Sequence, residues 1–511
     1  MSDWTSGYVS DIGYTFGYYR ELCPTHAKQA FLTQGLVFPE VKTACELGFG
    51  QGLSAVVHGS ASNIEWYGTD FNPAQASFAS GLAANAGSPC SLYDDSFQEF
   101  LARKDLPNFD FIGLHGVWSW ISSENQRAIV EFVKQRLNLG GVLYISYNTL
   151  PGWSAFAPMR HLMTQHANII GSEGEGIVNR IDGAVRFAEE LLKSEPNYLK
   201  NNPNVAKRLE RMRGLNRHYL AHEYFNKDWN PIHFETMASE LEAAKLTYAC
   251  SASIAEHIDV LNVSDEQQAL LSKISDPVLH QSVRDFMTDQ QFRRDYWVKG
   301  LQKISRVEQL EQFRSLRVML TKHKSDIELK ISGMRGSITL KEEIYNPIID
   351  YLALNPSTKI SDLESELAKK GVDIATIFQA VNILIAKESV VCLQDDTACQ
   401  ESIDNAKALN RSIMAQSKYG VDVNVLASPI IGGGLQFSRI HQLFILASLE
   451  GKKSPKDWAA SAWEHLQQIG QKLIKDGKAV DSEKDNLAEL NRLAEEFKSK
   501  GLNLARDSLI I

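Results

Sequence analysis

A glycine-rich stretch near the amino terminus constrains the fold more than any other part of the chain. Residues 43–53 read TACELGFGQGL, an apolar run that leads directly into three glycines at alternate positions, Gly48, Gly50 and Gly52. Glu46 stands two positions before the first of them. Glycines at the end of a strand let the backbone turn sharply and lie against a ligand, because no Cβ atom blocks the approach. The stretch therefore predicts the first strand and the ligand-binding turn of an α/β domain.

Two later segments have the features that such a turn requires. Residues 65–72, EWYGTDFN, read as a second strand that ends in Asp70, 22 positions after Gly48. A nucleoside-binding βαβ unit keeps a carboxylate for ribose hydroxyls at this place. Residues 110–120, DFIGLHGVWSW, read as a later strand whose exit carries His115 and two tryptophans.

The spacing of the glycines bears on the kind of ligand. The dinucleotide fingerprint has its third glycine three places after the second, and that place holds Leu53, so a helix is not expected to pack close under a pyrophosphate. A closely spaced Gly-x-Gly-x-Gly after a glutamate suits a ligand with a cationic centre and no phosphate. The stretch resembles that of the class I S-adenosylmethionine-dependent methyltransferases. A glycine-rich turn in some other α/β domain is the alternative.

Apolar strands alternate with helices from residue 41 to residue 147. We expect strands at 41–47, 64–69, 90–94, 109–114 and 141–147, and helices at 51–59, 73–86, 96–103 and 123–137. This alternation predicts a parallel, doubly wound sheet. The α/β pattern then returns, with a strand expected at 219–225, a helix at 231–245 and a last, antiparallel strand at 246–254. Residues 154–217 between the two parts read as a helical insertion at the ligand-binding edge.

The rest of the chain reads as mainly helical. Helices are expected at 265–273, 277–287 and 290–315, and strands at 317–322 and 326–331. Residues 338–393 then give three helices and a short strand, an order that resembles a winged helix. Its third helix has Lys387 as the one base at its end, which favours protein interaction over DNA reading. Residues 1–40, rich in tyrosine and with a helix at 24–34, either cover the sheet or form an aromatic lid over the ligand.

Composition limits the environment and the partners. The net charge is −9 with no long basic run, so nucleic acid is not expected as a partner. The six cysteines include no CxxC pair and read as reduced core thiols, which suggests the cytosol. Neither a signal peptide nor a run of about 18 apolar residues is visible, so we expect a soluble, cytoplasmic protein without a membrane partner.

Three strings together carry a specific family resemblance: ELGFGQG, LHGVWSWI at 114–121 and LYISYNTLPGW at 143–153. They resemble the bacterial methyltransferases that carry a methyltransferase regulatory domain, such as the rickettsial lysine methyltransferases that act on outer-membrane protein B. HEYF at 222–225 and QFRRDYWVKG at 291–300 resemble the two ends of that regulatory segment, and GYYRELCPTH at 17–26 resembles the aromatic opening of the family, although Ala27 follows where the family has proline.

The resemblance implies a Rossmann-like, seven-stranded class I methyltransferase sheet with a helical insertion, and a mainly helical C-terminal half with a winged-helix-like domain. The regions are then an N-terminal lid (1–40), the methyltransferase domain (41–262), a middle region (263–400) and a helical C-terminal region (401–511). It also implies S-adenosyl-L-methionine as cofactor and lysines of a protein substrate as acceptor, with a surface protein as one candidate and a homodimer as the candidate assembly.

Methyl transfer from a sulfonium is an in-line displacement, which requires placement and water exclusion and needs no metal. The predicted cofactor contacts are Tyr18, Glu46, Gly48, Gly50, Gln51, Gly52, Asp70, Phe71, Asp95, Ser96, His115 and Gly116. The predicted catalytic residues are His115, Tyr147 and Asn148, and the predicted acceptor-binding residues are Trp118, Trp120 and Trp153. Aromatic rings at strand exits would desolvate an ammonium and keep cation–π contact with it.

Several alternatives stay open at this point. His115 reads equally well as a base and as a structural residue, and Asp95 or Ser96 as a helix cap. Many amine methyltransferases carry Asp/Asn-Pro-Pro-aromatic where this chain has His-Gly-Val-Trp at 115–118, so methylation of oxygen is open as well. The rival functions are an O- or N-methyltransferase of a small molecule or surface polysaccharide, and a cofactor-binding protein without turnover.

Overall fold

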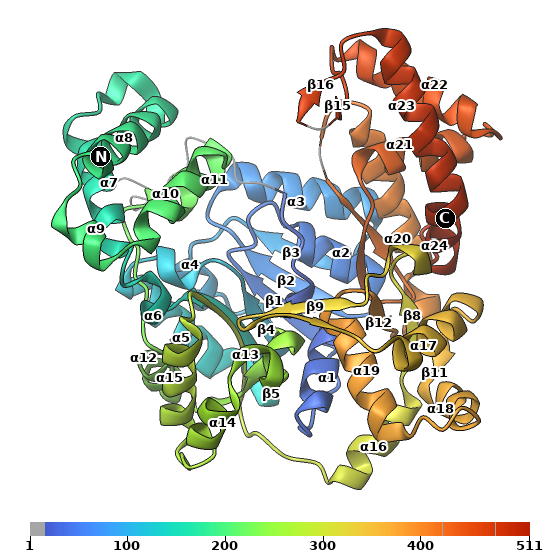
Figure 1. The fold of residues 1–511 in the computed structure, drawn as a ribbon, viewed down its shortest axis with the longest axis horizontal. Coiled ribbons are helices and arrows are strands. Elements are labelled where there is room, and N and C mark those ends of the chain that lie inside the picture. The colour runs from blue at the N-terminus through green and yellow to red at the C-terminus, as the bar shows by residue number, and fades with distance from the viewer. Residues whose placement is uncertain (1–15, 422, 476) are drawn as a thin grey trace.

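A seven-stranded mixed sheet forms the centre of the molecule in the computed structural model, which describes residues 16–421, 423–475 and 477–511 (Figure 1). The strand order is β3-β2-β1-β4-β5-β7-β6. The strands are β1 (Thr43–Leu47), β2 (Glu65–Thr69), β3 (Cys90–Tyr93), β4 (Phe109–Leu114), β5 (Leu137–Asn148), β6 (Thr247–Ser251) and β7 (Phe292–Val298). The first five are parallel, and β7 runs antiparallel to both of its neighbours. This is the Rossmann-like sheet that the sequence predicts.

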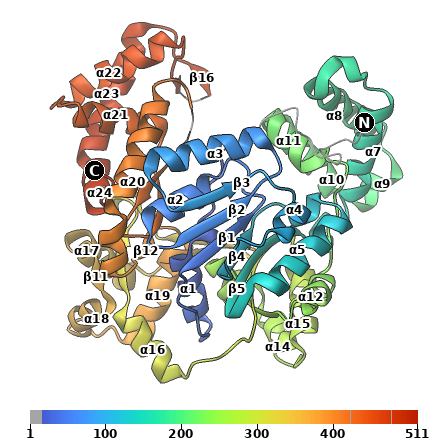
Figure 2. The ribbon, with the colours of Figure 1, turned by 180° about the vertical axis from the view of Figure 1, so that it is seen from behind.

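The elements that lead to the ligand-binding edge form where the pattern places them. They are the helices α2 (Leu53–Ala61), α3 (Pro73–Ala86), α4 (Phe97–Ala102) and α5 (Ser123–Arg136). α3 shows the local causes: Asn72 accepts a hydrogen bond from the Ala74 amide, Pro73 occupies the first turn, and Gly87 ends the helix with φ of 60°. Figure 2 shows α2 and α3 beside β2 and β3.

The end of the sheet differs from the prediction. Residues 219–225 are no strand, because α11 (Arg217–Tyr224) occupies them, and the expected helix over 290–315 contains β7 in its first part. Two arginines and an aspartate interrupt the apolar pattern of β7, FRRDYWV, and they hid the strand. The sheet therefore continues to Val298, beyond the predicted boundary at residue 262. The helix predicted at 231–245 is α12 (Phe234–Glu242).

The predicted insertion is helical and has a core of its own. Between β5 and β6 lie α6 (Leu150–Trp153), α7 (Ala157–Ile169), α8 (Gly176–Lys193), α9 (Asn197–Asn201), α10 (Asn204–Arg213) and then α11. Their apolar faces meet in one buried cluster around Met163, Ile181 and Leu209. Figure 1 shows these helices as a lobe on one side of the sheet, opposite the C-terminal helices. We call α7–α11 the helical lobe.

The middle region packs directly on the central sheet. Its elements are α13 (Asp259–Asn262), α14 (Asp265–Leu271), α15 (Pro277–Thr288), α16 (Arg306–Ser315), β8 (Arg317–Leu320), β9 (Lys330–Gly333), β10 (Gly336–Thr339), α17 (Glu342–Leu354), β11 (Thr358–Lys359), α18 (Ile360–Ala368), α19 (Ile374–Ala386) and β12 (Val390–Cys392). The order β11-β8-β12 makes a small sheet beside α17–α19, and the winged-helix class stays a prediction. The helix α1 (Pro24–Thr33) joins both parts, because Phe31, Tyr296 and Leu384 belong to one buried core.

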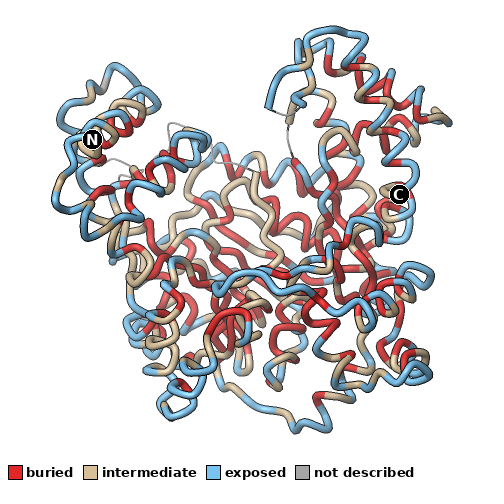
Figure 3. The backbone as a smooth tube through the Cα atoms, viewed as in Figure 1, coloured by how far each residue is buried: buried red, intermediate tan, exposed pale blue. Residues whose placement is uncertain are grey.

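The C-terminal region is helical with two hairpins. It comprises α20 (Asp396–Ser417), β13 (Val425–Ser428), β14 (Gly433–Gln436), α21 (Arg439–Leu449), α22 (Pro455–Gln468), β15 (Ile474–Lys475), β16 (Lys478–Ala479), α23 (Glu483–Glu496) and α24 (Leu502–Asp507). Its apolar residues share a core with Val56 of α2 and Leu82 of α3. Figure 3 shows buried residues concentrated on the inner faces of these helices and in the sheet. No described helix is both long and apolar enough to cross a bilayer.

Candidate active site

A cavity of about 310 Å³ lies at the carboxyl ends of β1, β2 and β4. The strand order reverses between β1 and β4, and open α/β sheets bind ligands at such a switch point. Of the residues predicted from the sequence, the cavity is lined by Glu46, Gly48, Gly50, Gln51, Asp70, Phe71, Asp95, Ser96, His115, Gly116 and Trp120. The fold thus brings the glycine turn, the two strand ends and one tryptophan together.

The three glycines of the turn all have left-handed backbone angles, but they differ in surroundings. The φ angles are 70° at Gly48, 58° at Gly50 and 68° at Gly52. A Cβ atom on Gly50 would meet nothing within 4 Å, so this backbone is open to a ligand. A Cβ atom on Gly52 would overlap Ala79, so this glycine lets α2 pack close to α3 and does not line the cavity.

Asp70 holds the glycine turn in place. Its Oδ2 accepts a hydrogen bond from the Gly50 amide at 2.8 Å, and its Oδ1 accepts one from the Asn72 amide at 3.0 Å. Burial raises the pKa of this carboxyl to about 6. Each carboxylate oxygen can accept a further bond, so Asp70 can hold the turn and bind ligand hydroxyls at the same time.

Glu46 brings an unsatisfied acceptor to the cavity wall. The side chain is only 2% exposed, and its Oε2 atom is buried without a hydrogen-bond partner among the described residues. Burial raises the pKa of the carboxyl to about 8, with the charge of Asp70 acting in the same direction. Buried polar atoms are normally hydrogen-bonded, so a cavity with this atom in its wall fits a ligand that brings N–H donors or a positive charge.

The protonation of the Glu46 carboxyl in the folded protein predicts how the stability depends on pH. Between about pH 4.5, the ordinary pKa of the carboxyl, and about pH 8, only the folded state holds the proton, so stability falls as pH rises across this window. We expect Glu46→Gln to flatten this fall, which for one group is at most about 1.4 kcal/mol per pH unit. Urea unfolding at pH 5, 6, 7 and 8 measures the free energy of unfolding of both proteins at each pH.

Glu131, whose side chain is 42% exposed, is the matched control, because Gln135 and Lys134 hold the pKa of its carboxyl below the ordinary value. Glu131→Gln should leave the pH profile close to that of the wild type. Asp70, with its raised pKa, keeps part of the slope below about pH 6 in both variants. An unchanged slope in Glu46→Gln would contradict the protonated state of Glu46.

His115 and Tyr19 form one wall of the cavity. The two rings stack with their centroids 3.6 Å apart, and His115 Nδ1 lies 2.7 Å from the Tyr144 hydroxyl. Burial lowers the pKa of His115 to about 4, so the ring is neutral at pH 7. Among the described residues no hydrogen-bond partner engages its Nε2 atom. The sequence predicted Tyr18 here, but the Tyr18 hydroxyl accepts from the Gly434 amide in the C-terminal hairpin.

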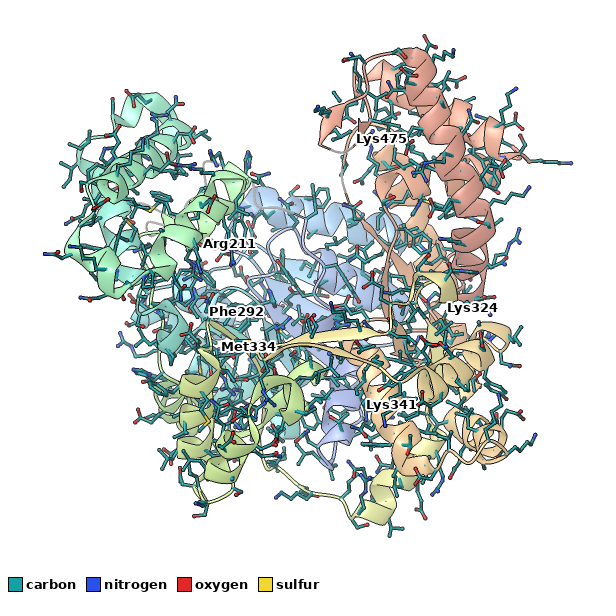
Figure 4. All side chains as sticks on the ribbon, in the orientation of Figure 1. Arg211, Phe292, Lys324, Met334, Lys341 and Lys475 are labelled. Carbon is teal, nitrogen blue, oxygen red and sulfur yellow. The ribbon has the colours of Figure 1, made fainter. Side chains whose placement is uncertain are left out.

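The last helix of the helical lobe and the segment after it form part of the cavity wall. His222, Glu223 and Asp228 line it from the segment around α11, and the Trp120 indole donates to the Glu223 carbonyl at 3.3 Å. Figure 4 shows Arg211 of α10 above Phe292, the first residue of β7. The arrangement provides a backbone cradle, two carboxylates and an aromatic wall next to the helical lobe.

Comparisons with known proteins agree with this architecture. The model of the "predicted methyltransferase regulatory domain" matches residues 216–299. Protein sll1526 of Synechocystis sp. is 37% identical over 98% of this chain and 98% of its own length. Protein RP789 of Rickettsia prowazekii is 22% identical over 92% of this chain and 88% of its own. The chain belongs to the methyltransferase family that carries this regulatory domain.

A solved structure extends the comparison to three dimensions. PKMT2 from Rickettsia typhi in complex with AdoHcy superposes with a TM-score of 0.70 at 18% identity, covering 95% of this chain and 98% of that chain. The two therefore share a fold over nearly their whole length, including the regions outside the sheet. In this chain the matched regulatory-domain segment is no separate unit, since residues 216–299 contain both β6 and β7 of the central sheet.

The residues predicted to act on the acceptor at the end of β5 do not reach the cavity of this methyltransferase. Tyr147 is fully buried and its hydroxyl donates to Asp295 at 2.8 Å. Asn148 is 2% exposed and accepts from the Trp153 indole at 3.1 Å. Side chains alternate between the faces of a strand, and Tyr144 and Ser146 are the β5 residues that bond to His115 and Gly116.

Two of the three predicted tryptophans are also structural. Trp118 is buried in the core behind β4, and Trp153 packs under the Arg208 guanidinium, 3.9 Å from its ring centroid. Sequence reasoning missed lining residues that tertiary structure brings in, namely Tyr19, Phe97, Asn125, His222, Glu223 and Asp228. The string HEYF marked 222–225, but nothing in it indicated contact with the glycine turn.

Proposed function

We propose that the protein is an S-adenosylmethionine-dependent methyltransferase that modifies lysine side chains of a protein substrate. The observation that carries the proposal is one cavity that combines an open glycine turn, the Asp70 carboxylate and the unsatisfied Oε2 atom of Glu46. A ligand with ribose hydroxyls and an ammonium group satisfies all three. The family membership and the fold shared with PKMT2 support the same proposal.

The residues have distinct roles in this proposal. Asp70 accepts from the ribose hydroxyls, and Glu46, ionised by the incoming charge, binds the amino group. Phe71, Asp95 and Ser96 lie on the wall beyond Asp70, where the base belongs. Of these, Ser96 also caps α4, and Asp95 pairs with Arg103 at 3.0 Å, so their backbone atoms are the contacts expected for the base. The bound cofactor supplies an electrophilic methyl group on a sulfonium.

The chain itself contributes placement and a dry surrounding. Tyr19, His115 and Trp120 line the part of the cavity away from Asp70 with aromatic surface. Neutral His115 adds no positive charge that would repel a sulfonium, and aromatic faces attract such a cation. An aligned nucleophile in a water-poor site accounts for most of the acceleration that such a transfer needs.

The lysine acceptor rests on the resemblance to the rickettsial lysine methyltransferases, and a cytoplasmic site of action and a homodimer belong to the same proposal. The test is transfer of tritium from methyl-labelled S-adenosylmethionine to a bacterial lysate. Label in protein, recovered as methyl-lysine after acid hydrolysis, is the expected result, with Asp70→Ala as the inactive control. Label in small molecules or polysaccharide would favour the other acceptors, and binding without transfer would favour a protein without turnover.

A further inference from the structure

A second cavity lies on the far side of the Tyr19–His115 stack. It measures about 730 Å³ and is enclosed by the segment before α1, the start of β7 and the ends of β12 and β14. Tyr19 and His115 line both cavities. The proposed cofactor site and the larger chamber therefore meet at these two rings, and His115 is reachable from both.

The inner end of this chamber combines aromatic surface with a carboxylate. Phe292 lies edge-on to His115, with ring centroids 6.0 Å apart, and Figure 4 shows it near the middle of the molecule. Glu21, whose side chain is 9% exposed, lines the same chamber. Burial opposes its ionisation, but Arg294, His26 and His115 outweigh this and hold its pKa below the ordinary value. Glu21 is thus negatively charged at pH 7.

The hydrogen bonds leave one acceptor atom available. Glu21 Oε1 accepts from Arg294 at 2.6 Å, and no described residue donates to its Oε2. The two arginines of the chamber are both paired, Arg294 with Glu21 and Arg20 with Glu388 at 3.2 Å. Lys322 is the remaining cation on the wall. A donor with a positive charge fits the free oxygen, and an alkyl chain fits the aromatic faces next to it.

We propose that this chamber is the entry for the methyl acceptor and that it binds a primary alkylamine, the end of a lysine side chain, with Glu21 as its anionic partner. The inference rests on the proposed function and names the route and the recognition group for its acceptor.

Methyl transfer along this route takes two steps, the loss of a proton from the ammonium and an in-line displacement at the methyl carbon. Glu21 favours the charged ammonium, so the amine gives up its proton to bulk solvent as it leaves this carboxylate and before it reacts, with Lys322 as the cation that favours the neutral form. The nitrogen lone pair then forms the bond to the methyl carbon, the carbon–sulfur bond breaks, and the sulfur keeps the electron pair as a neutral thioether. The product takes up a proton from solvent and leaves as a methylated ammonium through the chamber, while the thioether stays in the cofactor cavity.

A binding experiment tests the recognition group without turnover. Saturation-transfer NMR is recorded with n-butylamine and with butyrate on the full chain saturated with S-adenosylhomocysteine. We expect signals from butylamine and none from butyrate, and a loss of at least fivefold in Glu21→Gln. Glu364→Gln is the matched control, since Glu364 also pairs with an arginine, Arg314, but lies outside the chamber. Binding of butyrate in place of butylamine, or equal signals in Glu21→Gln, would overturn the proposal.

A blocking experiment tests the route. Lys322→Cys, half-buried at the chamber, is labelled with a bulky maleimide, and Lys341→Cys, exposed and apart from Phe292 in Figure 4, is labelled as control. Labelling at 322 should lower methyl transfer to protein at least tenfold while calorimetry shows unchanged affinity for S-adenosylhomocysteine. Full activity of the labelled 322 variant would refute the route and leave the proposed function intact. Butylamine binding through Glu21 in a wild type that methylates no lysine would refute the proposed function alone.

Discussion

Asp70→Ala should weaken the binding of S-adenosylhomocysteine by about 30-fold to 1,000-fold, or about 2–4 kcal/mol. The variant loses the acceptor for ribose hydroxyls and, with it, the bonds from the Gly50 and Asn72 amides that shape the turn. Both losses act on the same ligand, because Gly50 is the open glycine of the cradle. Isothermal titration calorimetry on the purified chain measures the effect.

Asp110→Ala is the control for losing a carboxylate that holds backbone amides. Asp110 accepts from the Lys42 and Thr43 amides, but at the opposite end of β1 from the cavity. Its replacement should lower stability and leave the affinity unchanged. Asp70→Asn keeps one oxygen that can accept from Gly50 and should fall between the wild type and Asp70→Ala. Wild-type affinity in Asp70→Ala would show that the ribose is bound elsewhere.

Arg293→Met should lower the free energy of unfolding by about 3–5 kcal/mol, the largest effect on stability that we expect from a single side chain. The guanidinium is 4% exposed and pairs with Asp285 and Asp295, while it packs 4.3 Å from the Phe234 ring centroid. Without it, two buried carboxyls lose their compensating charge, and the pKa of Asp285, which burial already raises to about 6, should rise further. Urea unfolding at 25 °C followed by tryptophan fluorescence measures the change.

Arg314→Met is the matched control for Arg293→Met. Arg314 also bonds a carboxylate, Glu364, with distances of 2.7 and 2.9 Å, but the two side chains are 39% and 25% exposed. Water compensates such a pair well, so the loss of Arg314 should lower the free energy of unfolding far less than the loss of Arg293. Equal effects of the two substitutions would mean that the Arg293 cluster adds nothing beyond a surface ion pair.

The parts of the fold that the sequence predicted are those that local patterns determine. The strands β1–β5 and the helices between them follow from apolar runs, glycines and caps, as at Asn72 and Pro73. β7 could not be predicted, because Arg293 and Asp295 stand where an apolar pattern was expected and are compensated by α15, by Tyr147 of β5 and by each other. The strand expected at 219–225 failed because the apolar pattern there serves the core of the helical lobe.

The residues of the site also fall into those that local patterns predict and those that only the tertiary structure brings together. The glycine turn, Glu46 and Asp70 lie within one βα unit and a neighbouring strand, so their spacing was enough to bring them together. Tyr147 was predicted in place of Tyr144 because the period of two along β5 does not by itself tell which face meets His115. The chamber beyond Tyr19 joins residues that are more than 400 positions apart, as the bond from Gly434 to Tyr18 shows. No local pattern encodes such a contact.

The position of α1 has a consequence for the synthesis of the chain. Phe31 of α1 shares its core with Tyr296 of β7 and Leu384 of α19, so this core cannot close before residue 384 has been synthesised. β5 likewise cannot pair with β7 until the helical lobe, which lies between them in the sequence, has been synthesised. Contacts of this sequence separation form slowly and leave apolar surface exposed meanwhile. The sheet is therefore complete only once β7 has been synthesised, and the chamber only once β14 has followed.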